Sequence, residues 1–311
     1  MAFPDLKKVK NIDTKRYPRL VVMSDMHRGD GGGNDDFAHN ALIYKCALDY
    51  YWERDFTYIE LGDAEEFWEI SSFDQIYITY TSIYRRLGQF HHRDPTRTRY
   101  LKVWGNHDLK WRDDTWVLSR LFPEIEIYEA VLVNKTLLLF HGHQADAACT
   151  GSWATFAKFF VRHFWPKLQK LGVKDPTRPA NNPGLSNRLD DIYYAWAKTR
   201  YGGVSVIIAG HTHRPVYENL SLTERIYLKS ELRSPGIQRK ESDRCYYNVG
   251  SCVHPDCITA VELLTEGRDT YINLVKWGIE AGNSEGNGDK FSVLVKRTIL
   301  ESSEKPLLTT K

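Results

Sequence analysis

The stretch that decides the fold reads LVVMSDMH, residues 20–27, where an apolar run leads directly into a polar turn. A short apolar run with β-branched residues that stops at polar ones is typical of a buried strand. The pattern recurs at 56–61 (FTYIEL), which stops at Gly62-Asp63, and at 100–104 (YLKVW), which stops at Gly105-Asn106. We therefore expect several strands whose carboxyl ends carry polar side chains.

The segments between and after these runs indicate a mixed architecture. Apolar residues follow helical spacing at 37–51 and at about 76–90, so the first half alternates strands and helices as parallel βαβ units do. The second half resembles hairpins, with strands expected at 130–133, 136–140, 204–209, 246–249, 258–263 and 270–275. Asn134-Lys135 would form the tight turn between the first two of these. The pattern predicts an α/β fold with two packed sheets flanked by helices.

The composition limits what the chain can be. Its 311 residues, 42% hydrophobic and 26% charged, are typical of a globular protein and exclude an intrinsically disordered one. A net charge of +2 gives no basic field, so no nucleic-acid partner is expected. No apolar run approaches the roughly 18 residues of a transmembrane span, and residues 1–18 lack the apolar core of a signal peptide. Five cysteines without a Cys-x-x-Cys pair favour free thiols and a cytoplasmic location.

The chain divides into one main domain and a tail. Residues 1–280 are expected to form the domain, with a helical insertion at about 147–201, and residues 281–311 a linker and a peripheral tail. Aromatic residues recur at helical spacing in the insertion, at Trp153, Phe156, Phe160 and Phe164. They fit either a helix packed on the body or a lid that grips a substrate.

Metal-binding residue types follow five of the expected strands. The blocks are Asp25-Met26-His27, Gly62-Asp63, Gly105-Asn106-His107-Asp108, His141-Gly142-His143 and Gly210-His211-Thr212-His213. Open α/β sheets place their sites at the carboxyl ends of strands, so the five blocks are expected to share one site. The spacing of two in Asp25-x-His27 and His211-x-His213 would point both side chains the same way from an extended backbone. Glycines beside the ligands would allow close approach of the backbone.

The ligand types indicate transition metals. Imidazole, carboxylate and amide donors suit Mn, Fe, Zn or Ni better than Ca or Mg, which prefer oxygen. The potential ligands outnumber what one ion needs, so two divalent ions are expected. Two ions a few ångströms apart can share a carboxylate and clamp a phosphate for in-line attack.

The five blocks, in this order, resemble the calcineurin-like metallophosphoesterase superfamily, with its pattern D-x-H, G-D, G-N-H-D/E, H and G-H-x-H. The resemblance implies a four-layer fold, a two-sheet sandwich flanked by helices, and a phosphoester hydrolase in which a hydroxide bridging two ions attacks phosphorus. By position, one ion would be held by Asp25, His27 and His213 and the other by Asn106, His141 and His211, with Asp63 bridging. His107 would face the phosphate, and Asp108 would orient the ring of His107. Manganese is the first expectation, with Fe, Zn and Ni as alternatives.

A finer resemblance concerns the substrate. GDAEEFW at 62–68 and GHTHRP at 210–215 are similar to bacterial UDP-2,3-diacylglucosamine hydrolases, which carry a lid where this chain has its insertion. Those enzymes typically have Arg in place of His107 and Asp in place of His143. A UDP-sugar lipid pyrophosphatase and a serine/threonine protein phosphatase therefore stay as alternatives. A non-enzymatic metal-bound scaffold is the least favoured, because scaffolds tend to lose the histidine that this chain keeps as His107.

Several nearby residues have more than one interpretation. Arg28 and Arg214 flank the ligand blocks and would bind a phosphate oxygen or form structural salt bridges. His143 would orient His141 or contact substrate, or be a plain loop residue. Glu66 and Trp68 are interpreted mainly as capping and packing residues. The substrate would be a phosphorylated small molecule or a lipid-linked one, and peripheral membrane contact and the oligomeric state stay open.

Overall fold

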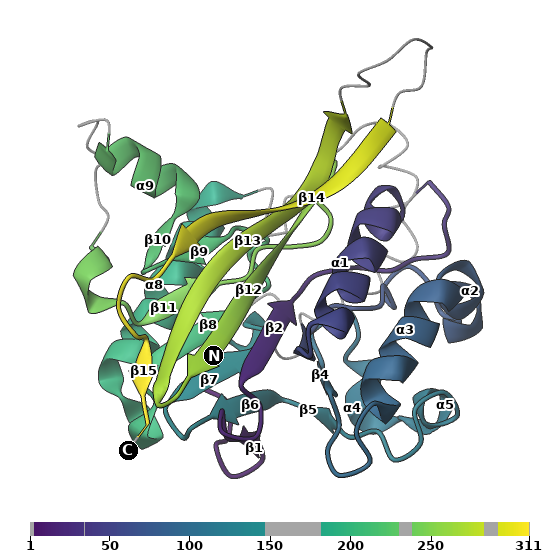
Figure 1. Ribbon diagram of the computed structural model, residues 1–311, viewed down its shortest axis with the longest axis horizontal. Helices are drawn as coiled ribbons and strands as arrows, with labels where there is room; N and C mark the ends of the chain where they lie inside the picture. Colours follow the sequence, from purple (N-terminus) through teal and green to yellow (C-terminus); the bar gives the residue numbers. More distant parts are fainter. Residues whose placement is uncertain (1–2, 34, 147–181, 230–237, 283–291, 311) are drawn as a thin grey trace.

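The computed structural model describes residues 3–33, 35–146, 182–229, 238–282 and 292–310, and contains two β-sheets packed face to face with helices outside them (Figure 1). One sheet has the order β14-β13-β12-β2-β3-β4-β5, with β15 paired to β13. Its strands are β2 (Arg19–Met23), β3 (Thr57–Leu61), β4 (Tyr100–Val103), β5 (Ile127–Tyr128), β12 (Cys257–Glu266), β13 (Asp269–Gly282), β14 (Ser292–Ser302) and β15 (Leu308–Thr309).

The second sheet has the order β1-β6-β7-β8-β11-β9-β10. Its strands are β1 (Lys10–Ile12), β6 (Ala130–Val133), β7 (Leu137–Phe140), β8 (Val206–Ala209), β9 (Val216–Tyr217), β10 (Leu220–Ser221) and β11 (Tyr246–Asn248). The main helices are α1 (Ala41–Glu53), α2 (Phe73–Thr79), α3 (Thr81–His92), α4 (Lys110–Asp113), α5 (Trp116–Ser119), α8 (Pro183–Thr199) and α9 (Leu222–Lys229). The two-sheet α/β sandwich predicted from the sequence is confirmed.

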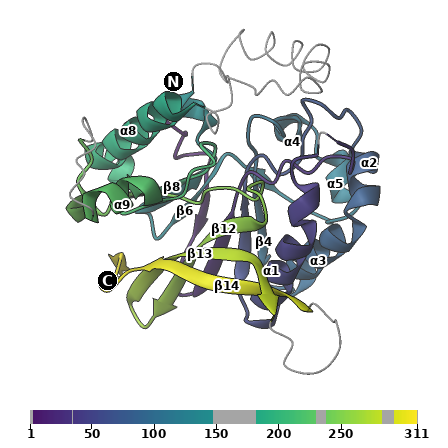
Figure 2. The same ribbon diagram turned by 90° about the horizontal axis from the view of Figure 1, so that it is seen from above.

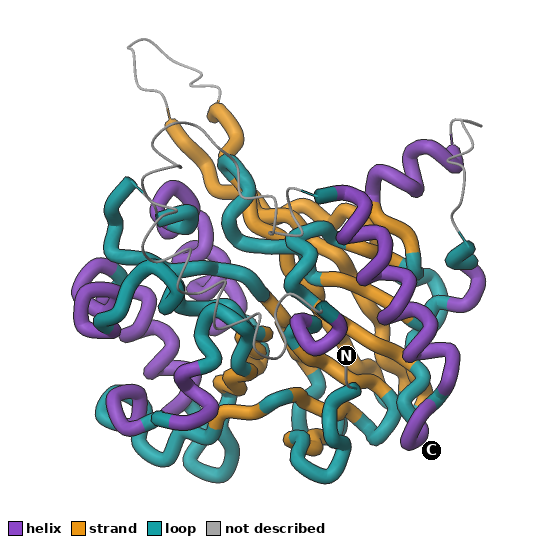
Figure 3. The backbone as a smooth tube through the Cα atoms, turned by 180° about the vertical axis from the view of Figure 1, so that it is seen from behind, coloured by secondary structure: helices purple, strands orange, loops and turns teal. Residues whose placement is uncertain are grey.

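Three apolar cores separate the four layers. Neighbouring residues of one strand face different cores, because side chains alternate across a strand. Val21 of β2 packs under α1 and α3, whereas Val22 enters the core between the sheets. On β7, Leu139 lies in the intersheet core, and Leu138 packs with Leu189 of α8 outside the second sheet. Figures 2 and 3 show helices on both outer sides of the paired sheets.

The strand directions bring the predicted ligand blocks to one edge. β2, β3 and β4 pair in parallel, and so do β7 and β8. The two sets belong to different sheets, and the polar block follows the carboxyl end of each strand. The loops after these five strands are therefore the ones that build the site.

Local differences from the expected elements have physical reasons. The helix expected at 76–90 is two helices, because Tyr80 (φ −110°, ψ 29°) leaves the helical region between α2 and α3. The hydroxyls of Thr79 and Thr81 donate to backbone carbonyls four residues earlier, a pattern that bends helices. The predicted turn at Asn134-Lys135 is confirmed, with both residues at positive φ.

The last segment belongs to a sheet. Residues 292–302 form β14, which pairs antiparallel along much of β13, where the sequence suggested only a peripheral tail after 280. The division into 1–280 and 281–311 stays a prediction, but β14 contributes an edge strand to the larger sheet. Of the expected insertion, α8 covers the second sheet, while the aromatic stripe at 153–164 lies outside the described residues. No helix in the described ranges combines the length and apolar character that a membrane span requires.

Candidate metal centre

All seven predicted metal ligands are buried at the carboxyl edge of the two sheets. Five of them have a left-handed backbone, with φ between 49° and 67°: Asp25, His27, Asp63, His211 and His213. The expectation of an extended backbone in the two ligand pairs is therefore wrong. Such residues cost about 1–3 kcal/mol each and cluster at functional sites, where surrounding contacts hold them.

The loops after β2 and β3 continue to pair beyond the ends of the strands. Asp25 N donates to Gly62 O (3.1 Å), and His27 N donates to Asp63 O (2.9 Å).

Two glycines allow the ligand loops to meet. A Cβ on Gly62, which has φ +86°, would lie 2.6 Å from Cγ of His141. A Cβ on Gly105 would lie 2.1 Å from Oδ1 of Asp63. Any side chain at either position would push a ligand away, so glycine is required here for the close approach expected from the sequence.

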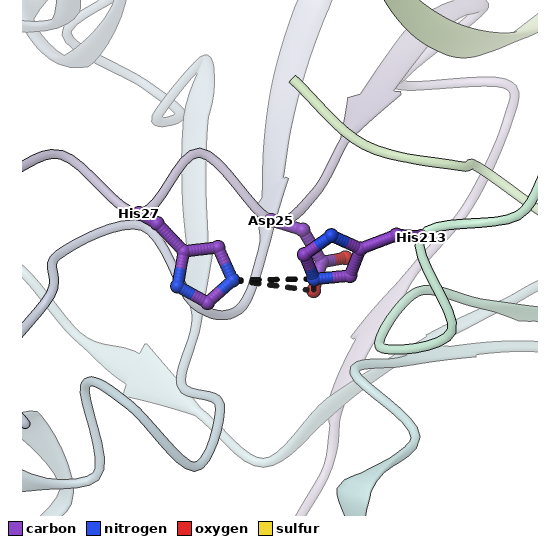
Figure 4. Close-up of side chains that lie close together, drawn as sticks. All are labelled: Asp25, His27 and His213. Carbon is purple, nitrogen blue, oxygen red and sulfur yellow. Dashed lines mark hydrogen bonds and ion pairs between the residues drawn. The ribbon is translucent and has the colours of Figure 1, made fainter. Parts of the chain in front are cut away.

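The first donor group is Asp25, His27 and His213 (Figure 4). Nε2 of His213 lies 3.2 Å from Oδ1 of Asp25 and 3.3 Å from Nε2 of His27. Nε2 of His27 lies 3.9 Å from the same carboxylate oxygen. The other oxygen of Asp25 accepts a hydrogen bond from His211 N (2.9 Å), which leaves Oδ1 aimed at the two imidazoles.

The second donor group is Asp63, His141 and His211, with Asn106 beside it. Nε2 of His141 lies 3.1 Å from Oδ2 of Asp63 and 3.2 Å from Oδ1 of Asn106. Nδ1 of His141 donates to the backbone carbonyl of Leu61 (3.0 Å). Since Nδ1 carries the proton of the neutral ring, the lone pair of Nε2 would be directed at the other ligands in that form.

These spacings fit metal ions. Zinc–nitrogen and zinc–oxygen bonds of about 2.0–2.2 Å in a tetrahedral site put neighbouring ligand atoms about 3.3–3.6 Å apart. The closest pairs in both groups lie at 3.1–3.3 Å. Oδ1 of Asp25 is buried and accepts no hydrogen bond among the described residues, as expected of an atom meant for a cation. The residues therefore fit two divalent transition metal ions.

Protons on histidines balance the carboxylates in the metal-free chain. Burial alone would raise the pKa of Asp63, but His141 and His107 hold it well below its usual value. Burial likewise opposes charge on His141, yet attraction to Asp63 and Asp25 raises its pKa to about 9. The pKa of His27 is also raised, because the nearby carboxylates of Asp25 and Glu66 outweigh the effect of its burial. Cations that bind here would replace these protons.

His107 lies beside the first group and is held by residues from the loop after β3. Its Nδ1 lies 2.7 Å from Oε1 of Glu66, and its ring stacks on Trp68 at 4.1 Å between centroids and 14° between planes. Burial lowers the pKa of His107, and attraction to Glu66 and Asp63 only partly offsets this. The uncharged imidazole is therefore the main form at neutral pH.

Asp108 does not contact His107 as the sequence suggested. Its Oδ2 accepts from Ala64 N at 2.9 Å and lies 3.8 Å from Nζ of Lys102. Burial raises its pKa to about 7 against the attraction of Lys102. The carboxylate within hydrogen-bonding distance of the His107 ring is that of Glu66.

Arg28 and Arg214 form structural ion pairs. The guanidinium of Arg28 is fully buried, 2.6 Å from Oε1 of Glu65 and 2.8 Å from Oε1 of Glu60. Arg214 donates to Asn187 (2.7 Å) and to Asp190, both on α8. These contacts favour the salt-bridge reading of both arginines over a direct contact with phosphate.

The buried pairs around Arg28 join three ligand loops. Lys102 of β4 lies 2.6 Å from Oε2 of Glu60 on β3 and 2.9 Å from Oε2 of Glu65 in the following loop. All of these side chains are fully buried. Ionic pairs of this kind contribute little net stability when complete but cost several kcal/mol when one partner is lost. These buried ion pairs therefore connect the loops after β2, β3 and β4.

Two acidic residues of the site were not assigned from the sequence. Oε2 of Glu66 lies 2.7 Å from Nδ1 of His27, in addition to its contact with His107. Oδ2 of Asp146 lies 3.2 Å from Nε2 of His211. Asp146 shares the loop of His141 and His143, and this position was the only signal for it. His143 itself is buried, with its ring 5.4 Å from that of His141 and 5.0 Å from that of Trp104.

Comparisons with known proteins do not assign the chain to a family. No protein-family model matches the sequence, and no curated protein matches it. Among solved structures, Vps29 of Chaetomium thermophilum is similar at TM-score 0.40 and 12% identity, over 93% of this chain and 97% of that one. Vps29 of Entamoeba histolytica, complexed with Zn²⁺, is similar at TM-score 0.33 and 14% identity, over 90% of this chain and 98% of that one. Likenesses this distant carry no conclusion about activity.

Proposed function

We propose that this chain is a phosphoester hydrolase that works with two divalent transition metal ions. The observation that carries the proposal is the position of Asp63, whose Oδ2 lies 3.1 Å from Nε2 of His141 and 3.8 Å from Nε2 of His27. One carboxylate thus reaches both donor groups, which is how paired metal sites share a ligand. The superfamily resemblance of the five sequence blocks supports the same reading.

The assignment of ligands follows the donor groups. One ion would be held by Asp25, His27 and His213 and the other by Asn106, His141 and His211, with Asp63 common to both. Manganese is the first candidate, and Fe, Zn or Ni also suit imidazole and carboxylate donors. When bound, the ions would polarise a phosphoryl oxygen and supply an activated water at neutral pH.

His107 would act on the substrate. With its Nδ1 held by Glu66, its Nε2 carries the free lone pair. A negatively charged phosphoester beside Nε2 would favour the protonated ring, which could then stabilise charge and donate a proton to the leaving oxygen. Burial of the ring and its stacking on Trp68 would keep this geometry fixed before substrate arrives.

The substrate would be a phosphorylated small molecule or a lipid-linked phosphate. The GDAEEFW block at 62–68 favours a UDP-sugar lipid pyrophosphate among specific candidates, and a phosphoserine or phosphothreonine peptide is the alternative. A metal-bound scaffold without activity is the hypothesis from a different class. Retention of His107 together with every ligand argues against it.

The test is a screen of metal-reconstituted protein with p-nitrophenyl phosphate, its bis ester, a phosphopeptide and a UDP-sugar lipid in detergent. We expect turnover of at least one of these, and a loss of more than about 100-fold in Asp63→Asn, because changes to outer contacts alone already cost about 10–100-fold. Glu262→Gln is the matched control, since Glu262 is equally buried but pairs with Arg297. Full activity in Asp63→Asn would contradict the metal mechanism, and two bound ions without any turnover would favour the scaffold.

A further inference from the structure

Glu66 lies between the imidazole rings of His27 and His107. His27 is expected to bind a metal ion, and His107 is expected to face the substrate. Its Oε2 is 2.7 Å from Nδ1 of His27, and its Oε1 is 2.7 Å from Nδ1 of His107. All three side chains are buried. The sequence interpretation of Glu66 as a capping residue does not account for two short contacts to ring nitrogens.

The chemistry of the carboxylate fixes the protons on both rings. Each oxygen of Glu66 lies at hydrogen-bonding distance from one ring nitrogen, and a carboxylate can only accept such bonds. Both Nδ1 atoms must then be N–H donors. In the neutral rings, the lone pair lies on Nε2 of each histidine.

Nε2 of His27 faces the other atoms of the first donor group. Nε2 of His27 lies 3.3 Å from Nε2 of His213 and 3.8 Å from Oδ2 of Asp63, inside the first donor group. The ring of His107 meets that of His27 edge-on at 4.5 Å between centroids, with 81° between the planes.

Trp68 holds the other face of His107. Its indole stacks on the imidazole, and its Nε1 donates to the backbone carbonyl of Asn106 (2.8 Å). The ring of His107 is therefore constrained by a hydrogen bond at one nitrogen and by aromatic contacts, which leaves few alternative orientations. The loop after β3 supplies both Glu66 and Trp68 as well as Asp63.

We propose that Glu66 is a positioning residue whose two oxygens fix the Nδ1–H tautomer and the orientation of both His27 and His107, so that one carboxylate couples the first metal site to the substrate-facing histidine. The part that concerns His107 rests on the proposed function. The part that concerns His27 is a statement about metal affinity and does not depend on hydrolysis.

The second metal group offers an internal contrast. There Nδ1 of His141 donates to the carbonyl of Leu61, a backbone atom that substitution of Glu66 leaves in place. Loss of the Glu66 carboxylate should thus weaken one ion and spare the other. A general loss of structure would weaken both.

The variant Glu66→Gln tests this in the full-length, metal-reconstituted protein. Glutamine has one accepting oxygen and one NH₂ group, so one of the two histidines loses its acceptor or changes tautomer. We expect the affinity of the first group for Co²⁺, measured by competition with a chelator, to fall about 10–100-fold, while the second group keeps its affinity. His213→Ala identifies which binding step belongs to the first group, and Glu262→Gln should leave both steps unchanged.

Two results would overturn the proposal: equal weakening of both steps, or no weakening of either. If Glu66→Gln does not fold, ¹⁵N-histidine NMR of the zinc-loaded wild-type protein gives a second test. Both His27 and His107 should carry their proton on Nδ1, and an unprotonated Nδ1 on either ring would contradict the proposal. Neither measurement uses turnover, so an inactive wild-type protein would count against the proposed function while leaving the metal role of Glu66 to be judged separately.

Discussion

The two donor groups use the same kinds of ligand but hold their histidines differently. In the first group, a side-chain carboxylate, Glu66, accepts from Nδ1 of His27. In the second, the backbone carbonyl of Leu61 accepts from Nδ1 of His141. A carboxylate increases the basicity of the ligand and can be shared with a second ring, whereas a carbonyl at the end of a strand is fixed by the sheet itself. The hydrogen bond that holds His27 can therefore be removed by substituting one side chain, whereas the one that holds His141 cannot.

The largest effect, on the free energy of unfolding, is expected from loss of the buried ion pairs of Arg28. Arg28→Met would remove one of the two fully buried cations that pair with Glu60 and Glu65, the other being Lys102, and breaking a buried pair costs about 3–5 kcal/mol. Denaturant unfolding should show this loss, while KM for any substrate found should stay the same in the protein that remains folded. A raised KM with unchanged stability would instead favour the phosphate-binding reading of Arg28.

The complement of the Glu66 experiment is Asn106→Ala. It removes the amide whose Oδ1 lies 3.2 Å from Nε2 of His141. We expect the second group to lose at least the roughly 10–100-fold in metal affinity that outer-contact changes cost, with the first group little altered. The chelator competition used for Glu66→Gln reports both steps. Greater weakening of the first binding step than of the second would contradict the division of the ligands into these two donor groups.

The smallest effect concerns pH and the proton that His141 would release when an ion binds. Because the pKa of His141 is raised to about 9, this ring is protonated at neutral pH without metal and must lose its proton when an ion binds. The apparent affinity of the second group should therefore rise about tenfold per pH unit from 7 towards 9 and then level off. Calorimetry in buffers of different ionisation enthalpy would count the protons released. An affinity independent of pH would contradict the displacement of a proton from His141 by the ion.

The grouping of the five blocks could be predicted from the sequence better than the contacts around them. Apolar runs that end in His, Asp or Asn mark strand ends, and parallel strands in a layered sheet bring those ends together. That physical rule located Asp25, Asp63 and His141 at one edge. It needed no knowledge of the exact loop geometry, which is why it succeeded.

The residues that support the ligands depend on loop geometry that periodicity does not encode. Arg28 follows a ligand directly, yet its left-handed neighbour His27 turns the chain so that Arg28 points inward to Glu65. Glu66 was interpreted mainly as a capping residue, but no helix begins until Phe73. Asp108 was assigned to His107 from adjacency alone, while the turn directs it to Ala64 N. Contacts of this kind follow only once the loops are placed.

The central claim is that two ions share Asp63, and the most direct measurement is the metal content of the chain at saturation. Equilibrium dialysis with Mn²⁺ or Zn²⁺, followed by elemental analysis, should give two ions per wild-type chain. Asp63→Asn should bind both ions more weakly, since its Oδ2 lies within 3.8 Å of a histidine in each group. A stoichiometry of one, or an Asp63→Asn protein that binds two ions as tightly as the wild type, would contradict the account.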